Sequence, residues 1–202
     1  MKKIGAILSI CIFNLAWGSY ILAAPANHIV ISEIQTSSTT DASQEFVELY
    51  NPTNSSMVLD GWILEYASAA GATWTKKAML NGVIPAHGFY LVATTGYVPA
   101  DVIMTAGLAN SSGHVRIKNG SNIVIDLVGW GSTAAHAEAS AAPSPIAGGS
   151  IERIPGRLNE LAGNGEDSDN NSLDFVLRDL AEPQRSSSTP EDPSSIPAEA
   201  PI

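Results

Sequence analysis

Short runs rich in Val, Ile, Tyr, Phe and Trp alternate with clusters of Gly, Asn, Ser and Thr through most of the chain. No stretch keeps the apolar period of an amphipathic helix for long. Eight runs have the length and composition of β-strands, and they cover residues 29–35, 46–50, 62–66, 73–79, 89–93, 114–118, 123–128 and 150–154. Short strands divided by turns predict an all-β protein, and an immunoglobulin-like β-sandwich suits this pattern best.

The segments between these runs carry turn signals. Asn119-Gly120 lies between two expected strands, and this pair is typical of a tight β-hairpin. Residues 132–149 are mainly Ala, Ser, Pro and Gly, which indicates a long surface loop. The run at residues 46–50 alternates, so that Val47 and Leu49 share one face of the expected strand and the other three residues share the opposite face.

The first 26 residues have the three-part layout of a secretory signal peptide. Lys2 and Lys3 precede an apolar run at residues 4–17, and small residues follow up to Ala24-Pro25-Ala26. Cleavage is expected after Ala26, because a cut after Ala24 would leave a proline directly behind it. The alternative is an uncleaved anchor, but the apolar run is shorter than the roughly 20 residues that a spanning helix needs. The sequence therefore predicts an exported protein that is secreted or held at the cell surface or in the periplasm.

The expected organisation is a signal peptide at residues 1–26, one domain at 27–187 and a disordered tail at 188–202. The tail is rich in Ser, Pro, Glu and Ala, so burial of apolar side chains cannot offset the entropy lost on ordering it. Cys11 is the only cysteine and lies inside the signal. The mature domain is therefore expected to be stabilised by its hydrophobic core alone, with no disulfide and no thiol nucleophile.

The mature chain is strongly acidic. Loss of the signal removes Lys2 and Lys3 and no acid, so the formal net charge changes from -10 to -12. A surface of this sign repels phosphate backbones, and the sequence shows no basic stripe. Nucleic acid is therefore rejected as the main partner, and no transmembrane segment is expected in the mature chain.

A series of motifs in the right order resembles the lamin tail domain. In chain order they are Ile31-Ser32-Glu33-Ile34, Glu45-Phe46-Val47-Glu48-Leu49-Tyr50-Asn51, Leu59-Asp60-Gly61-Trp62-Ile63-Leu64, Ile84-Pro85-Ala86-His87-Gly88-Phe89-Tyr90-Leu91-Val92 and Ile125-Asp126-Leu127-Val128-Gly129-Trp130-Gly131. The segments at 150–153, 170–175 and 183–184 are similar to the closing part of bacterial members. The resemblance runs from about Ile29 to Ser187.

The resemblance implies an immunoglobulin-like β-sandwich without catalytic residues, of a kind that bacteria export alone or joined to hydrolases and nucleases. It implies that Glu33, Glu45 and Glu48 belong to the first strand pair and order turns by accepting backbone N–H bonds. The expected function is non-catalytic binding, adhesion or scaffolding, and the expected partner is a protein or a cell-envelope polysaccharide. The alternative is an accessory domain that positions a secreted hydrolase or nuclease on its substrate.

The sequence lacks common catalytic motifs, which favours a protein that is not an enzyme. The sequence has no Gly-x-Ser-x-Gly, no phosphate-binding Gly-Lys-Ser/Thr loop and no His-Glu-x-x-His. Trp62 is expected in the core, whereas Trp74 lies between threonines and could be exposed to stack on a sugar ring. The histidines are His28, His87, His114 and His136. None has a second metal ligand or a carboxylate at a definite spacing, so all four are expected to be polar surface residues.

One acidic segment has the spacing of a metal-binding loop. Asp167, Asp169 and Asn171 alternate as the oxygen ligands of a calcium loop do, and Asp174 is close by. The segment lacks the glycine and the final glutamate of an EF-hand. The alternative is that these Asp and Asn side chains cap turns without any ion. Apart from calcium at these four residues, no cofactor is expected.

Overall fold

The structure is a computed structural model that describes residues 25–71, 73–155 and 162–193. The signal peptide expected at residues 1–26 therefore lies almost wholly outside the described residues. The end of the predicted tail, residues 194–202, lies outside them as well. Within the described part of the chain, no helix has the length and apolar character needed to cross a membrane.

The described residues form β-strands joined by turns and loops, with one short helix, and this confirms the predicted all-β class. The elements are β1 (Val30–Gln35), β2 (Phe46–Tyr50), β3 (Met57–Val58), β4 (Ile63–Ser68), β5 (Thr75–Met79), β6 (Val83–Ile84), β7 (Phe89–Thr94), β8 (Val102–Met104), β9 (Gly113–Lys118), β10 (Val124–Trp130), β11 (Ser150–Arg153), α1 (Asn171–Asp174) and β12 (Phe175–Arg178).

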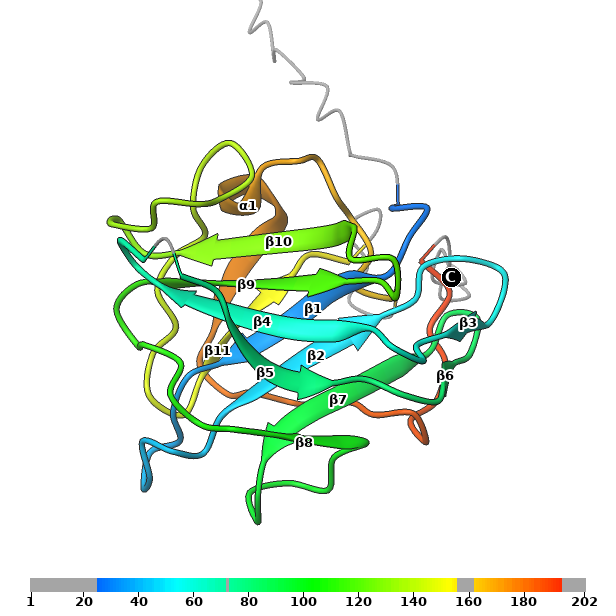
Figure 1. Ribbon diagram of the computed structural model, residues 1–202, viewed down its shortest axis with the longest axis horizontal. Helices are drawn as coiled ribbons and strands as arrows, with labels where there is room; N and C mark the ends of the chain where they lie inside the picture. The colour runs from blue at the N-terminus through cyan, green and yellow to red at the C-terminus, as the bar shows by residue number, and fades with distance from the viewer. Residues whose placement is uncertain (1–24, 72, 156–161, 194–202) are drawn as a thin grey trace, which may run out of the picture.

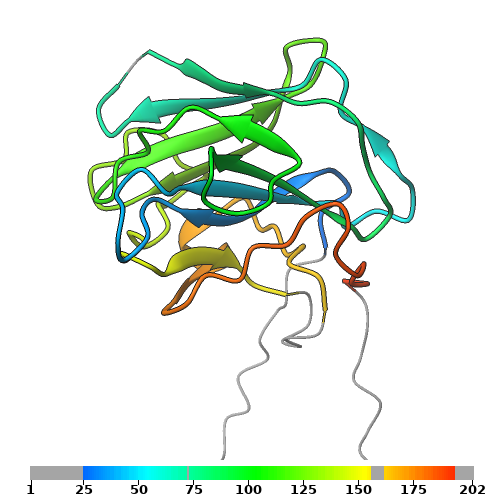
Figure 2. The ribbon, with the colours of Figure 1, turned by 90° about the horizontal axis from the view of Figure 1, so that it is seen from below.

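Two sheets face each other, which confirms the predicted immunoglobulin-like sandwich (Figures 1 and 2). The six-stranded sheet has the order β12-β11-β1-β2-β7-β8, and the four-stranded sheet has the order β10-β9-β4-β5. Strands β3 and β6 form a separate small ladder. Neighbouring strands run antiparallel except for β7 and β8, which pair in parallel. The first strand of the domain thus lies inside the larger sheet, between β2 and β11.

The main core fills the space between the sheets. Val47 and Leu49 of β2 point into it, as the alternating pattern predicts, and Trp62 and Trp130 are buried in the same cluster. Trp62 is 8% exposed, which confirms its predicted place in the core. Apolar side chains removed from water at this layer supply the main driving force for the sandwich, at roughly 25 cal/mol per Å² of buried area.

The outer face of β1, β2 and β7 is also buried. Residues 181–193, here called the C-terminal segment, run along it (Figure 2), and Tyr97, Val98 and Ala100 pack against Phe46 and Leu91. Tyr50 donates a hydrogen bond to the carbonyl oxygen of Glu191, and the backbone N–H of Glu191 donates to His87 at 2.8 Å. Pro193 is buried as well. The first residues of the predicted disordered tail, 188–193, therefore contact the domain beyond the boundary expected at residue 187.

Most predicted strands are present with ends shifted by one or two residues, and the hairpin at Asn119-Gly120 is confirmed by the pairing of β9 with β10. Four strands were not predicted. Strands β3, β6 and β8 are only two or three residues long, too short for a periodic pattern to show. Strand β12 follows directly on α1. Its residues Val176 and Leu177 point to opposite faces and are both exposed, so the strand lacks the alternation of a half-buried strand.

Candidate functional site

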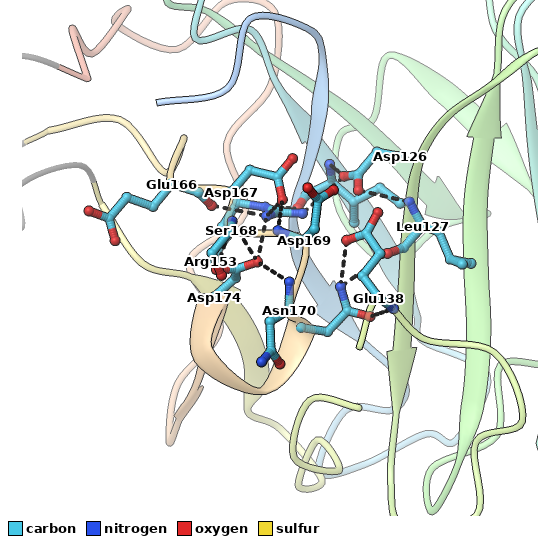
Figure 3. A network of polar contacts seen from close by, with 12 residues as sticks. Asp126, Leu127, Glu138, Arg153, Glu166, Asp167, Ser168, Asp169, Asn170 and Asp174 are labelled. Atoms are coloured by element: carbon cyan, nitrogen blue, oxygen red, sulfur yellow. Dashed lines mark hydrogen bonds and ion pairs between the residues drawn. The ribbon is translucent and has the colours of Figure 1, made fainter. Parts of the chain in front are cut away.

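A buried arginine organises the polar network shown in Figure 3. Arg153 of β11 has no exposed surface. Its Nη2 atom lies 3.0 Å from Oδ2 of Asp126, and its Nη1 atom lies 3.3 Å from Oδ1 of Asp167 and 3.6 Å from Oδ2 of Asp174. Its Nε atom donates to the carbonyl oxygen of Ile31 at 3.0 Å. One guanidinium thus ties β11 to β1, β10 and the segment before α1.

The ionisable groups around Arg153 have shifted pKa values. Burial raises the pKa of Asp126, while the charge of Arg153 opposes that rise. A hydrogen bond from His28 helps to lower the pKa of Asp167 to about 2, and the same bond raises the pKa of His28. Burial, together with the negative charges of Asp126 and Asp167, raises the pKa of Glu138 to about 8. This shift favours the neutral form of the Glu138 carboxyl group, which limits repulsion among the carboxyl groups.

The four residues predicted to bind calcium are only partly brought together. Asp167 and Asp174, with Glu138, offer oxygen atoms that all lie within 4.8 Å of one another. The side-chain oxygen of Asn171 instead accepts from the backbone of Gly129 at 2.9 Å. Asp169 is exposed, in a left-handed conformation with φ of 56°. Calcium binding at these residues stays untested, and an ion would have to compete with Arg153 for the two aspartates.

The alternative role of the acidic segment, capping turns, is visible in its hydrogen bonds. Asp174 accepts from the backbone N–H of Ser168 at 3.1 Å and from that of Asn170 at 3.3 Å. Asn170 in turn caps α1 by accepting from the N–H of Ser172. Sequence reasoning found Asp167 and Asp174 but missed Arg153, Asp126 and Glu138, because these come from distant segments and no spacing links them.

Three glutamates form a row across the outer face of the six-stranded sheet. Glu33 of β1 pairs in register with Glu48 of β2 on one side and with Glu152 of β11 on the other. Glu33 and Glu48 are buried under the C-terminal segment. The N–H of Glu182 donates to Glu33 at 3.4 Å, and the N–H of Gln184 donates to Glu48. These bonds attach the C-terminal segment to the sheet.

The two buried glutamates have raised pKa values. Burial raises the pKa of Glu33 to about 7, and burial followed by the charge of Glu33 raises that of Glu48 well above its ordinary value. Glu45 accepts from the backbone N–H groups of Gly107 and Leu108 at distances of 2.9 to 3.0 Å. These glutamates accept backbone N–H bonds, as expected, but the donors belong to residues 107–108 and to the C-terminal segment and not to turns of the first strand pair.

Aromatic and basic side chains gather on the outer face of the four-stranded sheet. The guanidinium carbon of Arg116 on β9 lies 4.0 Å from the ring centre of Trp74, which is partly exposed. Glu65 of β4 binds Arg116 at 2.7 Å and Lys118 at 3.1 Å. Lys76 of β5 is exposed and pairs in register with Glu65. Strands β10, β9, β4 and β5 lie foremost in Figure 1, and the loop that carries His136 covers this face around His114.

The prediction that all histidines are surface residues is wrong for His114. It is fully buried, because Trp74 and His136 lie over it with ring centres 6.1 and 5.2 Å away. Its Nε2 atom accepts from the backbone N–H of His136 at 2.9 Å. Burial lowers the pKa of His114. The loop that carries His136 packs directly against Gly129 of β10. A Cβ atom at Gly129 would lie 2.1 Å from the His136 carbonyl oxygen, so this close packing requires a glycine.

Comparison with known proteins gives one family. A family model described as Lamin Tail Domain matches residues 23–132, which include β1 to β10. Strands β11 and β12, the helix α1 and the C-terminal segment lie outside the matched range. No curated protein matches the chain.

Proposed function

Because the chain belongs to the lamin tail domain family, whose members are immunoglobulin-like and non-catalytic domains, we propose that it is an exported binding, adhesion or scaffolding module. Its partner is a protein or a polysaccharide of the cell envelope. Export is supported by the layout of residues 1–26, in which Lys2 and Lys3 precede an apolar run and a cleavage site after Ala26.

The main support for a binding role is that the two outer faces of the sandwich differ in how far they are covered. The outer face of β1, β2 and β7 in the six-stranded sheet is covered by the C-terminal segment and by residues 97–100. The outer face of the four-stranded sheet is covered by the His136 loop only around His114, and it carries Trp74 beside Arg116. A partly exposed aromatic ring next to charged groups is a common element of binding surfaces, because it offers a large contact area at a small entropic cost.

Fractionation of a bacterial host that expresses the full-length chain tests this proposal. We expect the protein outside the cytoplasm, with Asn27 as its first residue by mass spectrometry. We also expect the purified mature protein to sediment with envelope fragments, and the double variant W74A/K76A to sediment less. An intact Met1 on cytoplasmic protein would contradict export, and turnover of phosphoester or glycoside substrates by the purified chain would contradict a non-catalytic role.

A further inference from the structure

The outer face of the four-stranded sheet has a charge opposite to that of the protein as a whole. The chain has a formal net charge of -10. On this face, Lys76, Arg116 and Lys118 surround Glu65, so that three cations accompany one anion. The nearby Asp126 does not add to this face, because its carboxyl group points into the network around Arg153. A local basic surface on an acidic protein favours an anionic ligand.

Two of these cations are fixed in place before any ligand arrives. Glu65 holds Arg116 through both Nε, at 2.8 Å, and Nη2, at 2.7 Å. The ring of Trp74 lies against the same guanidinium. Lys118 is 8% exposed and serves mainly to neutralise Glu65. The positive charge left for a ligand is therefore that of Arg116, which is held rigidly, and that of Lys76, which extends into solvent.

The spacing of these groups fits a linear polymer better than a single small anion. Lys76 and Arg116 lie on β5 and β9, with β4 between them. Strands in a sheet are about 4.8 Å apart, so the two backbones are about 10 Å apart, which is near the length of two linked sugar rings. A carboxylate on every sugar, or on every second one, can reach both cations while a ring packs on Trp74.

We propose, as an extension of the proposed binding function, that this face binds an acidic polysaccharide whose sugars carry carboxylate groups. Trp74 contacts the apolar face of a sugar ring, and Lys76 and Arg116 bind the carboxylates. A nucleic acid is a poorer ligand, because its phosphates are closely spaced and extend past this small face toward an acidic surface. A neutral glycan would make no use of the basic groups.

Affinity electrophoresis of the full mature chain in gels containing polygalacturonate tests the proposal. The matched ligand control is the same polymer with its carboxylates methyl-esterified, which removes the charge and keeps the sugar rings. We expect migration to slow in the acidic polymer, to change little in the esterified one, and to recover as salt screens the contact. Single-stranded DNA in solution serves as a competing polyanion and should not displace the polymer at equal charge.

Variants of single residues locate the binding. Lys76→Ala should weaken binding about fivefold and Trp74→Ala about tenfold, as expected for exposed charged and aromatic contacts. Arg185→Ala is the matched control, because it removes an exposed cation that lies in the C-terminal segment. Lys76 is exposed, so its variant keeps the test valid even if Trp74→Ala unfolds.

Equal binding of both polymers, an unchanged affinity in Lys76→Ala, or tighter binding of DNA would each overturn the proposal. No binding of polygalacturonate would overturn it too. The proposed function would survive that failure if the mature protein still sedimented with envelope fragments, and it would fail separately if that sedimentation were absent.

Discussion

Replacing Glu33 by glutamine should stabilise the protein at pH 8 and change it little near pH 4. Glu33 is 4% exposed and has a pKa raised to about 7 by burial, from an ordinary value of 4.5. The unfolded chain therefore releases this proton between pH 4.5 and 7, while the folded protein still holds it. Glu33 therefore does not lower the free energy of unfolding below pH 4.5. Between pH 4.5 and 7 the folded state binds more protons than the unfolded state, so the free energy of unfolding falls as the pH rises.

The size of the effect follows from the shift. One pKa unit corresponds to about 1.4 kcal/mol, so the rise from 4.5 to about 7 amounts to about 3 kcal/mol. In a domain of this size that is a change in melting temperature of about 6 to 12 °C. Glutamine keeps an oxygen that can accept from the hydroxyl of Ser150, as Glu33 does. The variant also removes the charge that helps to raise the pKa of Glu48.

Chemical unfolding followed by tryptophan fluorescence at pH 4, 6 and 8 measures the difference between wild type and Glu33→Gln. Titratable groups distant from Glu33 are common to both proteins and largely cancel in the difference, whereas the lower pKa of Glu48 in the variant adds to its stabilisation at pH 8. Asp179→Asn, which removes an exposed carboxylate just after β12, is the control and should show no comparable change. Parallel curves for wild type and Glu33→Gln across this pH range would refute the reasoning.

Three further perturbations test other parts of the structure by thermal or chemical unfolding. Arg153→Met should cost about 3 to 5 kcal/mol, because it leaves Asp126 buried without its ionic partner, and a loss below 1 kcal/mol would contradict the buried network. A chain ending at residue 187 should be about 2 kcal/mol less stable than one ending at 193, since it loses the hydrogen bonds of Glu191 with Tyr50 and Gln184; equal stability would show that these contacts contribute nothing. Calcium and chelator should give the same melting curve, because Arg153 already neutralises two of the acidic groups, and a calcium-dependent rise that is lost in Glu138→Gln would reveal an ion site instead.

The fold could be predicted because strand patterning is local. Val47 and Leu49 enter the main core as their alternation requires. The same pattern predicts Phe46 and Tyr50 on the opposite face, and they lie there in separate buried clusters. The cover of this second face could not be predicted, because it comes from residues 97–100 and 181–193, which are distant in sequence from β2.

The candidate sites were harder to predict, because they depend on contacts between distant strands. Asp167 and Asp174 are close in sequence and were found, whereas Arg153, the residue that binds both, belongs to β11. The burial of His114 depends on a loop that returns over the sheet more than twenty residues later. Nothing in the local sequence of these residues distinguishes them from ordinary surface groups.

The position of β1 inside the six-stranded sheet sets the order in which the chain can fold. Its neighbour β11 begins more than a hundred residues later, as the pairing of Glu33 with Glu152 shows. Closing so long a loop costs entropy before the pairing repays it, and such topologies fold slowly. Until β11 has been synthesised, β1 remains an open edge and the sheet is incomplete. The larger sheet is therefore completed only after most of the domain has been made.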